Sequence, residues 1–412
     1  MTHPTSTPDQ PAEEPLMGLA AMMSKVCSGE PLTELANHLM ERLQRNPNDA
    51  NALMDLSIIS HLWFKHDIGL ATQARALKVR RLYTLPARSS AKIRLLALMH
   101  HGDLAANTPI EFLVQNSDVQ LQLLYLDPAQ PLPLDLPEHD VVFVAIAEST
   151  HSEALLRQLA LHAAHWQHPM LNRPERIARL SRDGVAWMLQ GVPGIDMPLS
   201  ARVNREALEQ VCAGTLPLAS VLADGAFPLI VRPLDSHAGH GLEKVDSAES
   251  LLAYLQGKTE NTFYLSRFVD YRSGDGLYRK YRIALVDGKA FAGHMAISEH
   301  WMIHYANAQM DVSAEKRSEE ASFMEGFESG FARRHAEALH AIDRLAGLEY
   351  LVIDCAESAD GKLLVFEIDS AAVVHAMESV TTFPYKRAHA QKIFQAFRTL
   401  LEKTVATAND TS

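Results

Sequence analysis

Five carboxylates lie within one short stretch near the C-terminal end of the chain, and three of them, Asp354, Glu367 and Asp369, are spaced to meet on one face. Residues 350–370 read YLVIDCAESADGKLLVFEIDS, two runs of strand-forming residues on either side of Asp360-Gly361. That dipeptide is typical of a two-residue β-hairpin turn. Counting back from such a turn along both strands sets Asp354 directly opposite Glu367.

Side chains alternate between the two faces of a strand, so Asp369 is expected on the same face as Glu367. Acids directly opposite each other lie roughly 5 Å apart, where like charges are destabilising unless something positive lies between them. A set of oxygen ligands suits Mg²⁺, with Mn²⁺ as an alternative metal. The competing interpretation is a solvated hairpin whose acids merely cover an exposed face, but the other face is too apolar for a peripheral hairpin. Its expected residues are Leu351, Ile353, Cys355, Leu364, Phe366 and Ile368.

Basic side chains are expected to face these acids from a neighbouring strand. Residues 280–297 predict two strands joined at Asp287-Gly288, and the first carries Lys280 and Arg282. Both side chains are expected to point into a cleft above the carboxylates.

A loop of small residues follows a strand in residues 227–245, FPLIVRPLDSHAGHGLEKV. Small residues allow backbone N–H groups to approach a phosphate, and Arg232 at the end of the strand adds positive charge. A tight hairpin without a ligand is the alternative. His237 and His240 inside the loop contact phosphate or substrate in the first interpretation and are solvated in the second. The small residues are Ser236, Ala238, Gly239 and Gly241.

Composition limits the class of protein. A chain of 412 residues with 47% hydrophobic and 21% charged residues has room for two or three globular domains, and its net charge of -12 argues against nucleic-acid binding. Three widely spaced cysteines predict neither a disulfide framework nor a zinc site. Because no stretch of 18 apolar residues occurs, we expect a cytoplasmic protein with no membrane association.

The N-terminal part is expected to be helical. Residues 1–16 are proline-rich and predict a disordered tail, and residues 17–86 carry a helical period throughout. The stretch RNPNDANALMDLS resembles the junction between tetratricopeptide repeats, with residues 71–82 as the partner helix. A segment with only one or two such repeats is not stable alone. We therefore expect these helices to pack on the rest of the protein or on a second subunit. A peptide or protein partner for residues 17–86 is the alternative role.

Two further domains are expected after these helices. Strands alternating with helices over residues 90–180 predict a small parallel α/β domain, with His100 and His101 at a strand end where ligands bind. Residues 181–405 are expected to form a larger α+β domain. Its helices are predicted at 176–188, 248–256, 318–345 with breaks near Gly326 and Gly330, and 375–401.

The order of these parts resembles the ATP-grasp superfamily of carboxylate–amine ligases, such as glutathione synthetase, D-alanine–D-alanine ligase and the ribosomal-protein glutamate ligases. The resemblance covers residues 92–403. It rests on the small α/β domain, the linker PMLNRPERIARLSRDG, the glycine loop after IVRP, the hinge FYLSRFVD, the strand KYRIALVDG, and the pair IDC and FEID.

The resemblance implies an ATP-grasp fold with a pre-ATP-grasp domain, and ATP with Mg²⁺ as cofactors. It implies magnesium ligands at Asp354, Glu367 and Asp369, and Arg282 and Arg317 as the groups that neutralise the transferring phosphoryl group. It also implies nucleotide contacts at Arg232, Ser236, His237, Gly239, His240, Gly241, Arg267, Phe268, Val269, Asp270 and Lys280. The run HWMIHYANAQ is expected in the acceptor pocket, with an aromatic core segment as the alternative.

The chain departs from the family pattern at three positions. Gly184 follows Asp183 where relatives usually have lysine, Arg232 replaces a lysine, and Asp369 replaces an asparagine. Arginine keeps the charge and can bind phosphate with two donors, and Arg182 is a candidate replacement for the first lysine. We therefore expect an ADP-forming ligase for small-molecule or peptide carboxylates and amines, with homodimer formation left open. The alternatives are a small-molecule kinase and a helical interaction protein whose degenerate nucleotide domain senses ATP.

Overall fold

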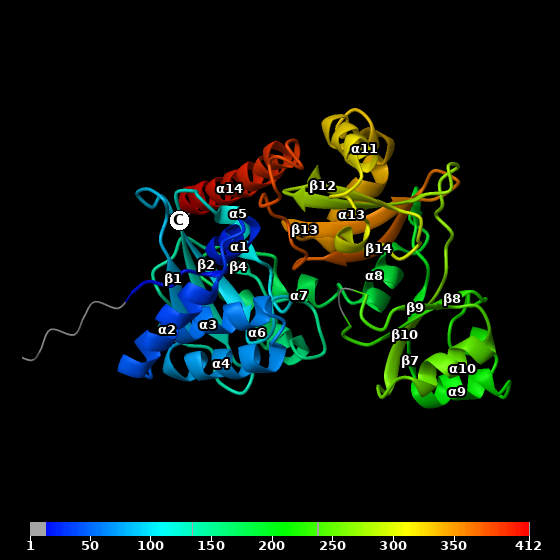
Figure 1. The fold of residues 1–412 in the computed structure, drawn as a ribbon, viewed down its shortest axis with the longest axis horizontal. Coiled ribbons are helices and arrows are strands. Elements are labelled where there is room, and N and C mark those ends of the chain that lie inside the picture. Colours follow the sequence, from blue (N-terminus) through cyan, green and yellow to red (C-terminus); the bar gives the residue numbers. More distant parts are fainter. Residues whose placement is uncertain (1–13, 134, 237–238, 412) are drawn as a thin grey trace, which may run out of the picture.

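The chain forms three sheets covered by helices, which confirms the predicted mixed α/β fold class (Figure 1). The computed structural model describes residues 14–133, 135–236 and 239–411. Residues 1–13 of the predicted tail lie outside this range, whereas Leu16 is a buried core residue with 5% of its surface exposed.

The N-terminal helices pack on the first sheet, as expected for a segment too short to be stable alone. Leu53 and Met54 share a core with Leu95 and Leu123 of that sheet. The predicted partner helix over 71–82 was misplaced, because the chain from Leu82 onward pairs with a sheet strand instead of continuing the helix. The helices are α1 (Leu19–Cys27), α2 (Thr33–Arg45), α3 (Ala50–Leu62) and α4 (His66–Val79).

The first sheet has the strand order β1-β3-β2-β4-β5, and all neighbours are parallel except β1 and β3. Its runs of buried aliphatic residues are typical of parallel strands covered on both faces. The strands are β1 (Leu82–Leu85), β2 (Ile93–His100), β3 (Val119–Leu126), β4 (Val141–Val144) and β5 (Met170–Leu171). The helices are α5 (Ile110–Val114), α6 (Glu153–Ala163) and α7 (Pro174–Ile177).

The second sheet forms a separate lobe with its own core (Figure 1). Its order is β7-β10-β8-β9, antiparallel throughout. The helix over 248–256 forms as predicted: Ser247 caps it by accepting from the Ser250 backbone N–H, and Gly257 ends it. The strands are β7 (Ser200–Asn204), β8 (Leu229–Pro233), β9 (Glu243–Val245) and β10 (Thr262–Arg267), and the helices are α9 (Arg205–Cys212), η1 (Leu218–Ser220) and α10 (Ala248–Gln256).

The third sheet holds the acidic hairpin, in the order β12-β11-β13-β14-β6. Its helices include the predicted run over 318–345, broken at Gly326 and Gly330. The strands are β6 (Ile195–Asp196), β11 (Tyr278–Val286), β12 (Lys289–Ser298), β13 (Tyr350–Glu357) and β14 (Leu363–Asp369). The helices are α8 (Arg182–Leu189), η2 (Tyr305–Asn307), α11 (Ala314–Glu325), α12 (Phe331–Arg334), α13 (Ala336–Ala346) and α14 (Lys386–Thr411).

Two predicted helices have other bounds than expected. The helix over 176–188 is divided into α7 and α8, because Ser181 caps α8 by accepting a hydrogen bond from the Gly184 backbone N–H at 3.2 Å. The last helix begins at Lys386 and not at 375, because Pro384 disfavours a helical conformation at the residue before it.

Helix α14 joins the first and third sheets. Phe397 lies with its ring centroid 5.7 Å from Phe143 of the first sheet and 5.7 Å from Tyr350 of the third. These two sheets therefore share a core, and the lobe with β7–β10 is packed separately. Within the described residues, no helix combines the length and apolar character needed to cross a bilayer.

Candidate functional site

The acidic hairpin has the predicted pairing at its acids but a different turn. Asp354 pairs with Glu367, as predicted. Ser358, however, pairs with Lys362, so the loop between them has three residues instead of two. A bulge between Asp354 and Cys355 on one strand, opposite Phe366 on the other, restores the register.

The bulge changes the face of one residue that was expected in the core. Leu364 pairs with Ala356, on the same face as Asp354, and it lines the cleft. The predicted all-apolar opposite face is therefore wrong at Leu364, because a shift of one residue moves a side chain to the other face. Leu364 is in the lining, so the cleft has an apolar part in its floor.

Asp354 is held by two basic side chains from β11. Arg282 donates from Nε to Oδ1 at 2.8 Å and from Nη2 to Oδ2 at 2.9 Å. Lys280 Nζ lies 2.7 Å from Oδ2. Burial alone would raise the pKa of this carboxyl, but Arg282 and Lys280 hold it well below its usual range. The positive charge predicted between the facing acids is thus supplied by side chains of the neighbouring strand.

Glu367 is paired with Arg182 at the start of α8. Burial opposes ionisation here too, but Arg182, Lys280 and Arg232 together lower the pKa of Glu367 to about 2. Asp369 accepts a hydrogen bond from the Ala371 backbone N–H at 2.7 Å. Arg182, a candidate replacement for the missing lysine, therefore does reach the acidic face.

Arg232 is a buried cation on the opposite side of the cleft, with 7% of its surface exposed. Its guanidinium donates to the Ser236 hydroxyl at 2.9 Å and to the Ser236 carbonyl oxygen. No ion pair is formed by it within the described parts of the chain. Burial, reinforced by the positive charge of Arg182, lowers its pKa to about 10. Such a charge is stabilised by an anion that is brought to it.

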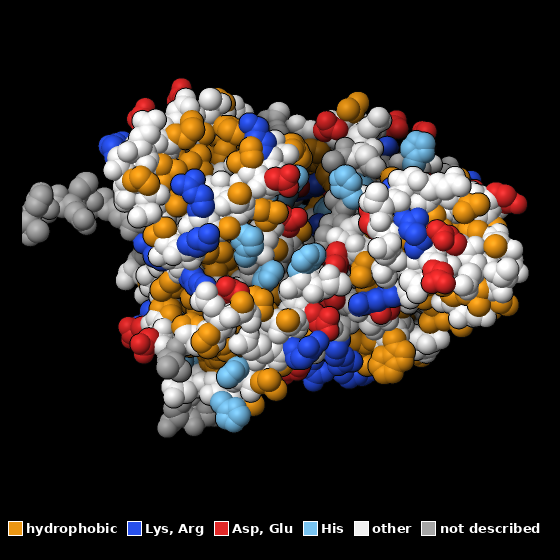
Figure 2. Space-filling view, turned by 90° about the horizontal axis from the view of Figure 1, so that it is seen from below, with side chains coloured by type: hydrophobic (Ala, Val, Ile, Leu, Met, Phe, Trp, Pro, Cys, Tyr) orange, Lys and Arg blue, Asp and Glu red, His pale blue; other side chains and the backbone are white. Residues whose placement is uncertain are grey.

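A cavity of about 480 Å³ lies between the second and third sheets. In Figure 2 the surface is hollowed between the N-terminal part and the lobe that carries α9 and α10. Both apolar side chains and cations line it, a mixture typical of ligand sites. The apolar lining includes Met197, Ile230, Phe268, Trp301 and Leu364, and the cations are Arg182, Arg232, Arg267, Lys280 and Arg282.

The glycine loop and the aromatic run meet at the edge of this cavity. A Cβ on Gly239, whose φ is +71°, would lie 2.2 Å from His304 Nε2. Both residues line the cavity, and burial lowers the pKa of His304. The His304 Nε2 is buried and has no hydrogen-bond partner among the described residues. Residues 301–304 of the aromatic run thus form part of the cavity lining.

The predicted nucleotide contacts divide into two groups. Gly239, Phe268, Val269 and Lys280 line the cavity, as do Arg232, Arg267 and Arg282. Ser236 acts through Arg232, and Gly241 accepts a hydrogen bond from Tyr254 at 2.7 Å. His240 and Asp270 are exposed and are not part of the lining. His237 lies outside the described residues.

Arg317 has other partners than the predicted phosphate, and the side chain of Arg267 is also engaged within the protein. The Arg267 guanidinium pairs with Asp196 at 2.8 Å and Asp224 at 3.2 Å. Arg317 donates to the backbone carbonyls of Met310 at 3.0 Å and Asp311 at 2.6 Å, and it is not part of the cavity lining. Arg317 therefore stabilises the start of α11 by binding the backbone that precedes it.

Some cavity residues carry no sequence signal. The predicted His100 and His101 are not in the lining, but Leu104 and Ala105 of the same loop are. Glu148, on the loop after β4, is not part of the lining, and burial raises its pKa to about 7. Only the strand-end position of these loops pointed towards a ligand.

The three predicted magnesium ligands do not form a ready-made metal centre. Within the described residues, no group of three or more His, Cys, Asp or Glu side chains is close enough to hold a metal ion. The magnesium assignment therefore stays a prediction. The oxygen-only donor set of Glu367 and Asp369 suits magnesium in kind, whereas both oxygens of Asp354 are engaged by Lys280 and Arg282.

Comparison with known proteins gives similarity in structure alone. No family model matches the sequence, and no curated protein does. The structure is similar to a RimK domain ATP-grasp protein from Sphaerobacter thermophilus, at 12% identity over 75% of this chain and 99% of that one, with a TM-score of 0.45. It is also similar to the D-alanine–D-alanine ligase from Coxiella burnetii, at 13% identity over 78% and 97% of the two chains, with a TM-score of 0.47.

A third similar structure is the VanG D-Ala:D-Ser ligase from Enterococcus faecalis, at 11% identity over 76% of this chain and all of that one, with a TM-score of 0.46. These are proteins of the kind that the order of motifs resembles. With TM-scores below 0.5, the likenesses carry no argument about what this chain binds or does.

Proposed function

We propose that this protein is an ATP- and magnesium-dependent ligase that joins a carboxylate to an amine, with a peptide or amino acid among its substrates. The reaction proceeds through an acyl phosphate and releases ADP and phosphate. The observation that carries the proposal is the combination of apolar side chains and several cations in the lining of one cavity.

The apolar part fits an adenine ring. Ile230 and Leu364 come from facing sheets, and Phe268 follows β10 at the point where the two sheets are connected. The Phe268 backbone N–H already donates to the Pro228 carbonyl oxygen at 2.9 Å, so the polar edge of a purine would be bound by backbone groups of Val269, which also lines the cavity. Apolar contact with a few backbone hydrogen bonds is the usual pattern for such a ring.

The cationic part fits a polyphosphate. Arg182, Arg232, Lys280 and Arg282 face three carboxylates there, so the cations outnumber the acids. Arg232 is the strongest indication, because a phosphate would supply the anionic partner that its buried guanidinium lacks among the described residues. Glu367 and Asp369 would hold magnesium, which neutralises phosphate charge when it is bound.

The reaction then needs positive charge where oxygens become more negative. A substrate carboxylate oxygen attacks the γ-phosphorus, and the bond to the β-phosphate oxygen breaks with its electron pair going to ADP. Arg282 stabilises the charge that develops on the transferred group. The amine nitrogen next attacks the acyl carbon and loses a proton as phosphate leaves. The part that Asp354 plays is to anchor Lys280 and Arg282.

The test is the release of ADP and phosphate with pooled amino acids and peptides. The wild-type chain should release phosphate only when ATP, magnesium and both substrates are present, and the product should contain a new amide. Replacing Arg282→Met should lower turnover by about 100-fold or more, as loss of a group that stabilises transition-state charge does. Arg157→Met on the exposed surface of α6 is the matched control and should retain wild-type turnover.

Two results would count against the proposal. No turnover with any pool, together with no rise in melting temperature on adding ATP, would exclude the ligase. A stable phosphorylated product in place of an amide would assign the cavity to the kinase alternative.

A further inference from the structure

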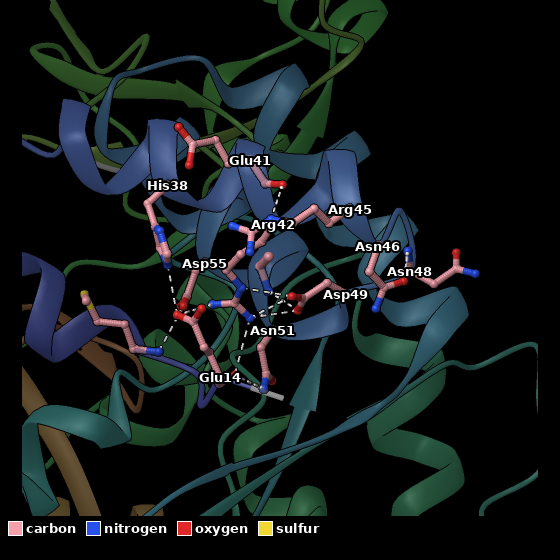
Figure 3. A network of polar contacts seen from close by, with 12 residues as sticks. Glu14, His38, Glu41, Arg42, Arg45, Asn46, Asn48, Asp49, Asn51 and Asp55 are labelled. Atoms are coloured by element: carbon pink, nitrogen blue, oxygen red, sulfur yellow. Dashed lines mark hydrogen bonds and ion pairs between the residues drawn. The ribbon is translucent and has the colours of Figure 1, made fainter. Parts of the chain in front are cut away.

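The chain before α1 lies extended across α2 and α3, and side chains of these helices bind its backbone (Figure 3). The carbonyl oxygen of Glu14 accepts from Asn51 Nδ2 at 2.9 Å and from Arg42 Nη2 at 3.3 Å. The backbone N–H groups of Met17 and Gly18 donate to the two oxygens of Asp55 at 2.9 and 3.1 Å. The helices thus bind residues 14–18 in the way that a groove binds a peptide.

Side chains of the segment are also recognised. The Glu14 carboxylate lies 2.9 Å from His38 Nε2 and 3.5 Å from Arg42 Nη1 (Figure 3). Leu16 enters the core beside Leu53. Two residues further on, Gly18 has a φ of +80°, and a Cβ there would lie 2.6 Å from Glu111 Oε2. The contacts therefore select an acidic residue, an apolar residue and a glycine at alternate positions.

The binding groups are held in place by the helices themselves. Arg42 donates from Nε and Nη2 to the two oxygens of Asp49, both at 2.9 Å. Asn51 Oδ1 accepts from Arg80 of the segment after α4 at 2.5 Å. Because these contacts do not involve the bound segment, the groove is prepared for a ligand before residues 14–18 occupy it.

The groove contacts residues 14–18 through buried acids. Apolar side chains in their place would bind a permanently attached segment more tightly. Asp55 has 1% of its surface exposed. Burial raises its pKa to about 6 and that of Glu111 to about 7, with Arg42 and Asp49 as the charged neighbours of Asp55. Buried charged groups often cost stability relative to well-packed apolar residues, and they give specificity instead. Such a design suits a ligand that is recognised and exchanged.

We propose that the groove between α2 and α3 is a peptide-binding site, and that residues 14–18 are a ligand in cis. An extended segment of a partner protein with an acidic residue, an apolar residue and a glycine at alternate positions displaces them. This mode of recognition satisfies the main chain of the peptide and reads alternate side chains. The proposal concerns residues 14–111 and does not depend on the function proposed for the cavity.

Helix α1, which begins directly after the segment, contacts two other parts of the chain. Ser24 of α1 accepts from Gln115 Nε2 at 3.2 Å, and its Oγ lies 3.7 Å from Met377 Sδ. Met377 belongs to the connection between β14 and α14, whose first residues, 371–373, line the cavity. The segment is therefore joined through α1 to the connection that borders the cavity.

The test uses a labelled peptide with the sequence of residues 14–20, EPLMGLA, and the full chain. Gly18→Ala in the chain disfavours binding in cis, both by its φ and by the contact with Glu111, and leaves the groove open. Fluorescence anisotropy should show that the peptide binds the Gly18→Ala chain at least about 10-fold more tightly than the wild-type chain. Adding Asn51→Ala should abolish this gain, and Asn48→Ala on the exposed connection between α2 and α3 is its matched control. A peptide with alanine in place of its glycine should not bind.

Several outcomes would overturn the proposal. Equal binding to both chains, binding that is insensitive to Asn51→Ala, or equal binding of the alanine peptide would show that the groove does not recognise this segment. A Gly18→Ala chain that forms dimers without binding peptide would assign the groove to a second copy of the chain.

Hydrogen exchange of the wild-type chain provides a test that needs no variant. The backbone N–H groups of Met17, Gly18 and Ala20 should exchange at least about 100-fold faster than those in the middle of α3, because the segment opens locally. Equal protection of the two sets would mean that residues 14–20 leave only when the domain unfolds, and the proposal would then be wrong.

Discussion

The cavity and the N-terminal groove both bury carboxylates, but they stabilise them differently. In the cavity, Lys280, Arg282 and Arg182 keep the pKa values of Asp354 and Glu367 low despite burial. In the groove, Asp55 and Glu111 accept hydrogen bonds chiefly from backbone N–H groups, and burial raises their pKa values. Burial alone therefore does not decide the charge of a site; the charge of the nearest donors does.

This difference has a consequence for function. The cavity keeps its acids ionised and still has cations in excess, so it is prepared for an anionic ligand. In the groove, burial makes the acids costly to ionise, and backbone N–H groups donate hydrogen bonds to them. The groove therefore suits a peptide. The difference can be tested by replacing, in each region, the charged side chain on which it depends.

The largest expected effect is on stability when the anchor of the cavity cations is removed. Asp354→Ala leaves Lys280 and Arg282 without their carboxylate, and removing one partner of a buried ion pair costs about 3–5 kcal/mol. Urea unfolding should show this loss. Asp360→Ala, at the exposed hairpin turn, is the control and should leave the midpoint unchanged. A small loss for Asp354→Ala would mean that the two cations are stabilised by other groups.

The next effect is a dependence of stability on pH in the groove. A carboxyl whose folded pKa is raised stabilises the fold below its unfolded pKa and loses that contribution as the pH rises through the folded pKa. For Asp55, a rise from 3.8 to about 6 corresponds to about 3 kcal/mol, lost between about pH 4 and pH 7. The stability of the wild type relative to Asp55→Asn, measured by urea unfolding across this range, should therefore fall as the pH increases. A constant difference would show that Asp55 does not titrate as its burial requires.

The smallest effect on stability is expected when Arg232 is replaced. Unlike most replacements of a buried residue, this one is not expected to destabilise the fold. Because burial disfavours its charge, Arg232→Met should leave the unfolding free energy unchanged or raise it by about 1 kcal/mol. The same change should weaken ATP binding by at least about 10-fold. A large loss of stability would mean that Arg232 serves the fold and not a ligand.

The sequence predicted the acidic pair for a reason that was only partly correct. The assumed two-residue turn is a three-residue loop, and the bulge opposite Phe366 compensates for the extra residue, so Asp354 still faces Glu367. Leu364 lies on the other side of the bulge and changes face. Turn type and bulges depend on packing around the strands, which local patterns do not contain.

Contacts between distant segments were the least predictable. Arg182 and Glu367 are 185 residues apart, and nothing in either local pattern indicates that they pair. The proline-rich start of the chain predicted a tail up to residue 16, whereas Glu14 and Leu16 are bound by helices whose groove becomes visible only once α2 and α3 are packed together. Helices, strands and the cations on β11 were predictable because periodicity and turn residues are local signals.

The central claim is that the cations of the cavity bind a nucleotide through its phosphates. Calorimetric titration of the wild-type chain in magnesium buffer tests it directly, with ATP and adenosine as ligands. We expect ATP to bind at least about 100-fold more tightly than adenosine, and we expect this difference to shrink as salt screens the charges. Equal affinity for the two ligands, or no binding of ATP, would contradict the claim.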